Sequence, residues 1–379
     1  MNIFKQNLGR RQFLSVSSMA LGAGMLAKPS RLFAAEGGPP GGGGPMGQSA
    51  PKTIGTGKYG KYIMLSEKAE YGERGAMMIG VNQGSIPGCN MSAITGRMPP
   101  PGPMPGHDMG GETHENPEYL IHLGNNPDDP LDLGAEVDLY LGAGKWLEKY
   151  TFNRTTAVYL PTGFYHTPWK VKKIWREMTW VNLHVGITGA SAGGGGAPGG
   201  APGGAPGGVP GGEPSGGQPM TPTFRSGFTG FTEEEKTKAK TTGYVFSDYM
   251  RSGVGPGFTK PEGGEWIAYL DCTIVAEAPL TRIIRYNPEE APYTVIDTQT
   301  NKYESFLILY GIGTDDFTDL GADVEIYMGP EKEKHTFSTS AIVYVPPYTE
   351  HGPLIVKKGR QPFNFLEVVG GPQLPGVII

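Results

Sequence analysis

The chain has 379 residues, of which 61 are Gly and 35 are Pro, and 37% are hydrophobic. About a quarter of the chain therefore consists of residues that break helices, which excludes a long-helix protein or a coiled coil. The length allows two domains, each able to bury its own core. A formal charge of −5 does not favour nucleic acid as a partner.

The first 35 residues carry no acidic residue but five basic ones, Lys5, Arg10, Arg11, Lys28 and Arg31. Subtracting this +5 from the total of −5 leaves a charge of about −10 on the remainder. Arg10 and Arg11 precede an apolar run of small residues, which predicts a targeting peptide. The run, residues 14–27, is too short to cross about 30 Å of hydrocarbon, so we expect no stable membrane anchor.

The paired arginines followed by Phe13 and Leu14 resemble the twin-arginine export signal, with Gly9 and Ser15 departing from its usual pattern. The resemblance implies export of an already folded protein by the twin-arginine machinery, to the periplasm or outside the cell. It also implies that a metal or cofactor can be loaded before export.

An internal repeat organises the rest of the chain. The run that begins at Asp132 (DLGAEVDLYLG) recurs at Asp319 (DLGADVEIYMG), and the segments that end at His166 and His351 also match. Two Gly/Pro-rich stretches have no side chains from which to build a core. We therefore expect a signal peptide (1–35), a disordered segment (36–55), an N-terminal barrel (56–188), a linker (189–222) and a C-terminal barrel (223–379).

Each copy consists of short alternating segments, such as residues 136–141 and 157–160, separated by Gly, Pro, Asn and Asp clusters. No 3.6-residue periodicity is sustained. This pattern predicts an all-β fold, either a small sandwich or a barrel. The two cysteines, Cys89 and Cys272, lack metal-ligand spacing, and we expect buried thiols, with a single disulfide as the alternative.

The first copy contains a cluster with the spacing of metal ligands. Glu112, His114 and Glu118 are followed about 50 residues later by His166, which comes just after a Pro-x-Gly turn. Glu112 and His114 are two residues apart, so on a strand they project from the same face. Two imidazoles and two carboxylates inside a barrel would need a cation to compensate their charge.

These residues resemble the two sequence motifs of the cupin superfamily, and the duplication resembles that of a bicupin. The resemblance implies two jelly-roll barrels, each a double-stranded β-helix, with one divalent metal held by Glu112, His114, Glu118 and His166. Glu112 stands where the family has its first histidine, and Thr155 and Lys170 also depart from the motif. Alternatively, Glu112 is a solvated loop residue.

The donor set of nitrogen and oxygen without thiolate favours Mn(II) or Fe(II), with Zn, Ni or Co as alternatives. His107 lies between Met104 and Met109, and this group could hold copper; more often such residues are solvated or pack the barrel mouth. His122 has the same strand parity as Glu118 and so is expected to face inward, either as a substrate contact or as a core histidine. His122 and His107 are the two weak catalytic candidates.

The second copy retains fewer ligands. His351 matches His166, and Glu304 matches Glu118 if one residue is skipped; otherwise Ser305 takes that place. The gapped alignment puts threonines, Thr298 and Thr300, at the positions of the first two ligands. We therefore expect the C-terminal barrel to be metal-free and structural.

The sequence as a whole predicts an exported metal-dependent enzyme, a decarboxylase or dioxygenase, that acts on a small organic acid or similar oxygenated molecule. A non-catalytic periplasmic binder of metal or a small ligand is the alternative. A homo-oligomer is compatible with the sequence.

Overall fold

The computed structural model describes most of both copies. The described residues are 52–67, 76–100, 104–107, 114, 116–142, 147–186, 249–254, 258–272, 274–275, 278–312, 316 and 318–371. The expected signal peptide and the expected linker lie outside these ranges, as does most of the expected disordered segment. Among the described residues, no helix has the length and apolarity needed to span a bilayer.

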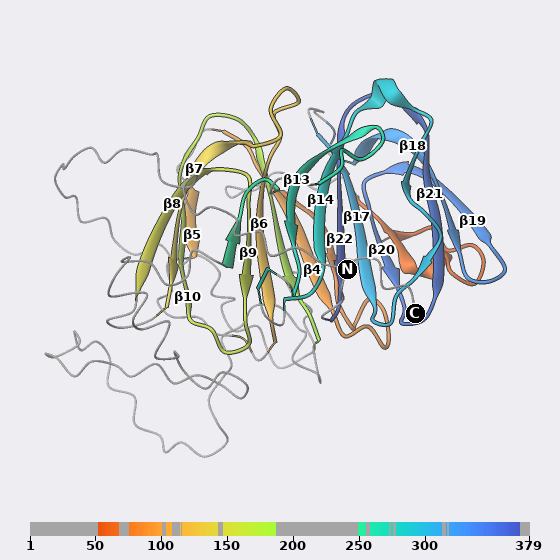
Figure 1. The fold of residues 1–379 in the computed structure, drawn as a ribbon, viewed down its shortest axis with the longest axis horizontal. Coiled ribbons are helices and arrows are strands. Elements are labelled where there is room, and N and C mark those ends of the chain that lie inside the picture. The colour runs from red at the N-terminus through yellow and green to blue at the C-terminus, as the bar shows by residue number, and fades with distance from the viewer. Residues whose placement is uncertain are drawn as a thin grey trace, which may run out of the picture. The chain divides into compact units, whose positions relative to one another are not determined.

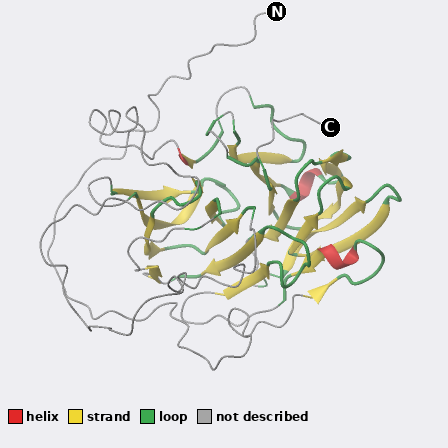
Figure 2. Ribbon diagram, turned by 90° about the horizontal axis from the view of Figure 1, so that it is seen from below, coloured by secondary structure: helices red, strands yellow, loops and turns green. Residues whose placement is uncertain are grey.

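The described residues form antiparallel strands and two short 3-10 turns, Gly60–Tyr62 and Pro288–Glu290 (Figure 2). In the first barrel the sheets have the strand orders β12-β9-β6-β11-β4-β3 and β5-β10-β7-β8. Their bounds are β12 (Met250–Arg251), β9 (Thr156–Leu160), β6 (Glu118–Gly124), β11 (Met178–His184), β4 (Ser92–Met98), β3 (Ala76–Val81), β5 (Met104–His107), β10 (His166–Ile174), β7 (Asp132–Leu141) and β8 (Glu148–Arg154).

The second barrel has sheets of the orders β1-β2-β20-β17-β22-β14-β13 and β15-β21-β18-β19, and the short β16 also pairs with β21. Their bounds are β1 (Lys52–Thr53), β2 (Ile63–Leu65), β20 (Ala341–Val345), β17 (Ser305–Gly311), β22 (Phe363–Val369), β14 (Thr281–Tyr286), β13 (Gly264–Leu270), β15 (Tyr293–Ile296), β21 (Glu350–Gly359), β18 (Asp319–Met328), β19 (Glu333–Thr339) and β16 (Gln299–Thr300).

The two barrels have the same topology. The order β9-β6-β11-β4 in the first corresponds to β20-β17-β22-β14 in the second, and β5-β10-β7-β8 corresponds to β15-β21-β18-β19. Eight strands divided between two sheets in this order make a jelly roll. The predicted all-β fold with a duplicated jelly-roll barrel is confirmed.

The repeated Asp-Leu-Gly-Ala sequence has a local structural reason. Gly134 and Gly321 have φ values of 72° and 77°, in the left-handed region that favours glycine. The carboxylates of Asp132 and Asp319 accept hydrogen bonds from the N–H groups of these glycines, at 3.0 and 2.9 Å. Each glycine lies in a stretch of a long strand, β7 or β18, where the pairing register with the neighbouring β8 or β19 shifts.

The strand β6 is buried on both faces because it lies between two cores. Tyr119, Ile121 and Leu123 belong to a large apolar cluster that includes β17 residues of the second barrel, such as Phe306 and Ile308. The alternate residues of β6 face the interior of the first barrel. Figure 1 shows the two inner sheets, with β6 and β17, between the outer sheets of the two barrels.

Each barrel also receives an edge strand from the segment that precedes the other. β2 pairs with β20, with Ile63 opposite Val343. β12 pairs with β9, with Met250 opposite Val158. The described parts of the two barrels are therefore interlocked by main-chain hydrogen bonds as well as by apolar packing.

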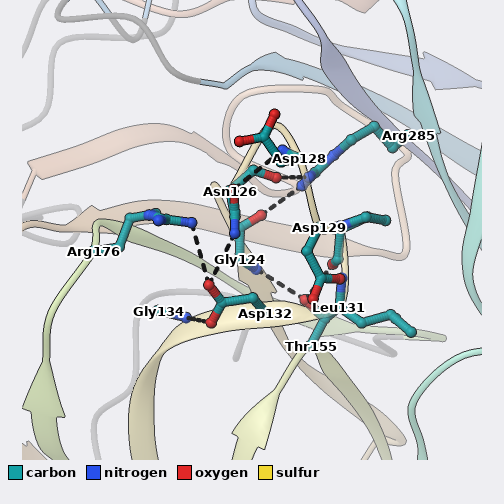
Figure 3. Close-up of polar contacts among 11 residues, drawn as sticks. Gly124, Asn126, Asp128, Asp129, Leu131, Asp132, Gly134, Thr155, Arg176 and Arg285 are labelled. Atoms are coloured by element: carbon teal, nitrogen blue, oxygen red, sulfur yellow. Dashed lines mark hydrogen bonds and ion pairs between the residues drawn. The ribbon is translucent and has the colours of Figure 1, made fainter.

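Two buried arginines at equivalent positions, Arg97 and Arg285, link the barrels. Arg285 Nη2 donates to Gly124 O at 2.6 Å, and its Nη1 donates to Asn126 O (Figure 3). Arg97 Nη2 donates in the same way to Gly311 O. Burial lowers the pKa of Arg285 to about 10, so the guanidinium remains charged at neutral pH.

Both cysteines are free thiols; Cys89 is buried and Cys272 is half-buried. The alternative of a disulfide between them is wrong. Cys89 Sγ instead contacts Met91 O at 3.1 Å, within the apolar cluster between the barrels.

Candidate metal centre

The turn between β9 and β10 places His166. Gly163 has φ 72°, and Phe164 N–H donates to Pro161 O at 3.0 Å, which closes the turn. Gly163 N–H donates to His114 O at 2.8 Å, so the same turn holds the backbone of His114. Residues about 50 positions apart in the sequence are thereby brought together at one end of the first barrel.

Two neighbouring strands place the other members of the cluster. Glu118 is the first residue of β6 and His184 is the last residue of β11, and the two are directly paired. Asn182, two residues before His184, donates from Nδ2 to Glu118 Oε1 at 2.6 Å. This amide fixes the carboxylate and leaves Oε2 facing the histidines.

The histidines surround this carboxylate oxygen. Glu118 Oε2 lies 3.1 Å from His166 Nε2 and 3.3 Å from His114 Nε2. The His114 ring is 5.1 Å from the His166 ring and 4.6 Å from the His184 ring, measured between centroids. One ligand atom from each of His114, Glu118 and His184 lies within 4.8 Å of the other two.

The carboxylate is anionic although it is buried. Burial by itself raises the pKa of Glu118, but the positive charge that the imidazoles of His166, His184 and His114 carry when protonated outweighs that effect. The net result is a pKa well below the usual range of a carboxyl. Apart from these two short contacts with histidine nitrogens, Glu118 Oε2 has no polar partner among the described residues.

The position of the proton on the His166 imidazole determines how this ring can interact with Glu118. His166 Nδ1 lies 3.2 Å from Phe164 O, a carbonyl that can only accept, so we assign the imidazole proton to Nδ1. In the neutral ring, Nε2 then carries a lone pair that faces the anionic Glu118 Oε2. A proton on Nε2 or a metal ion between the two atoms would reconcile them at 3.1 Å, and the convergence of three imidazoles on one carboxylate favours the metal ion.

The donor set fits a divalent metal ion. Two ligands about 2.1 Å from one ion and at right angles stand about 3.0 Å apart, close to the spacing of the Glu118 and His166 atoms. Hydrogen bonds to Phe164 O and from Asn182 supply the outer contacts that orient metal ligands. His114 is 22% exposed, so solvent reaches one side of the cluster.

The structure brings together three of the four predicted ligands, His114, Glu118 and His166. The fourth, Glu112, lies outside the described residues, as does Met109. His107 lies at the end of β5, where its backbone is paired with that of Trp169; the structure describes only the backbone of this residue.

His122 faces inward, as its strand parity predicted, but it lies four residues beyond Glu118 and not among the clustered histidines. Its ring packs 5.2 Å from Phe152 and 5.5 Å from Trp169.

His184 is the member of the cluster that the sequence analysis missed. It falls beyond both motifs, at the end of a strand whose residues alternate between two faces. Val181 and Leu183 belong to the apolar cluster between the barrels, whereas Asn182 contacts Glu118. This alternation was the available signal, because it assigns His184 to the same face as Asn182.

The strand register also decides how the two copies correspond. Ser305 pairs with Val345 and Val369, as Glu118 pairs with Leu160 and His184. Ser305 is therefore the counterpart of Glu118, and the alignment that used Glu304 is wrong.

Glu304 has another role, at the contact between the barrels. Its Oε2 accepts hydrogen bonds from Asn90 N–H and from Tyr344 O–H, both at 2.9 Å.

In the ungapped register, Gln299 and Asn301 replace Thr298 and Thr300 as the counterparts of Glu112 and His114. The second barrel keeps a single histidine at the corresponding place, His351.

The interior of the second barrel compensates its charge with a guanidinium group. Gln299 Nε2 lies 3.0 Å from His351 Nε2 and 2.6 Å from Glu367 Oε1. Glu367 also forms an ion pair with Arg282. Burial lowers the pKa of His351, which favours the neutral imidazole.

No protein-family model and no curated protein matches the chain. Among solved structures it is similar to an oxalate decarboxylase studied for its substrate binding mode, at 12% identity, with 84% of this chain and 79% of the other covered and a TM-score of 0.47. It is also similar to the Bacillus subtilis oxalate decarboxylase studied for its Mn(II) centres, at 11% identity, with the same coverage and a TM-score of 0.46. At these values no site residue or reaction carries over to this chain.

Proposed function

We propose that this chain is an exported metalloenzyme that acts on a small organic acid or a similar oxygenated molecule. The first barrel would hold one divalent cation through His114, Glu118, His166 and His184. The observation that carries the proposal is the convergence of imidazoles on one buried carboxylate oxygen, with Glu118 Oε2 at 3.1 Å from His166 Nε2 and 3.3 Å from His114 Nε2 and with His184 in the same cluster. Glu112 remains a predicted additional ligand.

The nature of the donors supports the choice of metal. Three imidazole nitrogens and one carboxylate oxygen, without sulfur, suit Mn(II) or Fe(II), and Zn, Ni, Co and Cu can also bind such sites. When bound, a divalent ion supplies Lewis-acid chemistry that polarises a carboxylate or carbonyl oxygen of the substrate.

The chain's own groups would prepare this site before substrate arrives. The carbonyl of Phe164 holds the proton of His166 on Nδ1 and so keeps Nε2 available as a ligand. The amide of Asn182 holds one carboxylate oxygen of Glu118 and directs the other to the cation. The solvent-exposed side of His114 is where a substrate acid group would approach.

The second barrel would bind no metal. Arg282 provides a fixed positive charge beside the buried Glu367. Ser305 and Val369 stand where the first barrel has Glu118 and His184. A barrel with its charge already balanced needs no cation, so we assign it a structural role.

The experiment loads the full mature chain with Mn, Fe, Zn, Ni or Cu separately. Bound metal is measured by mass spectrometry, and CO₂ release and O₂ consumption are followed with oxalate, diketones and phenolic acids. We expect one ion per chain and turnover with at least one metal and acid. Tight metal binding without turnover would leave a non-catalytic binder, and absence of metal would contradict both functions.

His166→Ala and His351→Ala form a matched pair for the same measurement, because the two histidines occupy equivalent positions and make the same backbone contact. We expect the first to lose the metal and the second to retain it. Equal metal contents in the two variants would contradict the assignment to the first barrel.

Export by the twin-arginine pathway is part of the proposal and rests on the N-terminal sequence. Replacing Arg10 and Arg11 by lysine should retain the protein in the cytoplasm of the expressing cell. Cell fractionation measures this, and unchanged export of the variant would contradict it.

A further inference from the structure

Besides Glu118 Oε2, two buried polar atoms on adjoining rings of the first barrel have no hydrogen-bond partner among the described residues. They are His122 Nδ1 and the indole Nε1 of Trp169. His122 is 2% exposed, and its ring centroid lies 5.5 Å from that of Trp169. Because buried polar groups are almost always hydrogen-bonded, two such atoms on adjoining rings indicate a missing partner.

The two atoms are complementary in chemistry. An indole N–H can only donate a hydrogen bond. The His122 imidazole forms a hydrogen bond with the backbone of Thr156, and since Nδ1 has no partner we assign that bond to Nε2. Nδ1 then carries a lone pair and can only accept. A single O–H group could accept from Trp169 and donate to His122.

Among the described residues, the rings beside this pair are aromatic. Phe152 lies edge-on to His122 at 5.2 Å, and Trp180 lies 6.5 Å from Trp169. No charged group contributes to the pKa of His122, which burial lowers to about 3. A neutral hydroxyl suits this environment, whereas a carboxylate or an ammonium group would be desolvated without compensation.

The pair is separate from the histidine cluster but belongs to the same interior. His122 lies four residues beyond Glu118 along β6, which corresponds to about 13 Å. Both residues lie on the face of β6 opposite to Tyr119 and Ile121, which pack against the second barrel. A molecule that entered past the cluster would therefore meet the aromatic rings and then the donor–acceptor pair.

We propose that the first barrel binds a hydroxylated aromatic acid, with its hydroxyl group between Trp169 Nε1 and His122 Nδ1. The inference rests on the proposed function, because the acid group of the same molecule would face the cation at Glu118. It narrows the substrate class to acids that carry a hydroxyl at the end remote from the carboxylate.

The test compares three probes on the metal-loaded full chain by calorimetry: 4-hydroxybenzoate, 4-methoxybenzoate and benzoate. The methoxy compound keeps the oxygen but cannot donate a hydrogen bond. We expect 4-hydroxybenzoate to bind at least about tenfold more tightly than either of the others. Equal affinities, or no binding of any probe, would overturn the proposal.

Trp169→Phe and His122→Phe remove one polar atom each and keep an aromatic ring. Each should abolish the preference for the hydroxyl while the metal content stays at the wild-type level. Trp266→Phe is the control, since its indole already donates to Thr259 O. Persistence of the preference in both test variants would mean that water, and not the ligand, satisfies the pair.

Failure of the metal proposal would give a different result. A chain that contains no metal but still prefers 4-hydroxybenzoate, and loses this preference in Trp169→Phe, would refute the cation and support the hydroxyl site. Circular dichroism of each variant establishes that it is folded. Equal affinities of the three probes for the wild-type chain would overturn the proposal even if no variant folds.

Discussion

Replacement of Arg285 by Met tests whether the buried arginines hold the two barrels together. The substitution keeps the length of the apolar side chain but removes all of the donors. Three acceptors lose their partner: Gly124 O at 2.6 Å, Asn126 O, and Asn364 Oδ1 at 3.0 Å. A buried acceptor left without a partner costs about 1–2 kcal/mol, which gives about 3–6 kcal/mol in total.

Part of this cost is offset because Met needs no desolvation of a charge. The lowered pKa of Arg285, about 10, reflects that penalty in the native chain. We therefore expect a net loss of about 3 kcal/mol in the free energy of unfolding. Urea unfolding followed by circular dichroism and by tryptophan fluorescence measures it, and the two probes detect any separate unfolding of the barrels.

Arg176→Met is the matched control. Its guanidinium is 43% exposed and has one ion pair, with Asp132 at 3.2 Å (Figure 3). An exposed pair of this kind contributes less than about 1 kcal/mol. If Arg285→Met cost no more than Arg176→Met, the buried arginine would not be a structural link between the barrels.

Four further predictions concern the interiors of the barrels and the contact between them. His184→Ala should weaken metal binding at least about tenfold in a chelator competition, and wild-type affinity would exclude His184 as a ligand. The pKa of His122 is about 3 in the folded chain, against an ordinary value of 6.5. Between these two pH values the unfolded state therefore binds more protons than the folded state. The free energy of unfolding falls as the pH drops through this range, by at most about 1.4 kcal/mol per pH unit. Urea unfolding at pH 7 and pH 4 should show a smaller fall for His122→Phe than for the wild type, and equal falls would contradict the buried neutral imidazole. Arg282→Met should lower the free energy of unfolding by about 3–5 kcal/mol, because Glu367 is left buried and without its ion-pair partner. The double variant with Glu367→Met should recover most of this loss in the same assay. No recovery would contradict the ion pair. Glu304→Ala removes two hydrogen bonds and should lower the free energy of unfolding by about 2 kcal/mol, with the metal content unchanged. Loss of metal would contradict the assignment of Glu304 to the contact between the barrels.

The fold could be predicted from the sequence because the repeated segments are short, contiguous runs of matching residues. The matching runs at Asp132 and Asp319 contain the same glycine in the left-handed region and the same aspartate that binds its N–H group. Alternation of apolar residues then gave the strands. The pairing of β2 with β20, and of β12 with β9, could not be read in this way, because strand exchange depends on how the two copies pack.

The candidate site was predictable where its residues lie close to turns and motifs. His114, Glu118 and His166 were found from their spacing, and the structure brings them together. His184 lies outside any motif and reaches the cluster only through the pairing of β11 with β6.

The second copy shows the same limit of sequence reasoning. Skipping one residue aligned Glu304 with Glu118, a match of residue type that ignored strand register. In the structure Ser305 occupies the equivalent place. The guanidinium of Arg282 lies on another strand, so its pairing with Glu367 was not visible from the sequence.

The central claim is that the first barrel, and not the second, holds a divalent cation. Anomalous diffraction from crystals of the mature chain grown with Mn(II) tests it most directly. We predict one strong peak, within bonding distance of Glu118 Oε2 and His166 Nε2 and of both His114 and His184. A map without a peak at that position, or with its main peak beside His351, would contradict the claim.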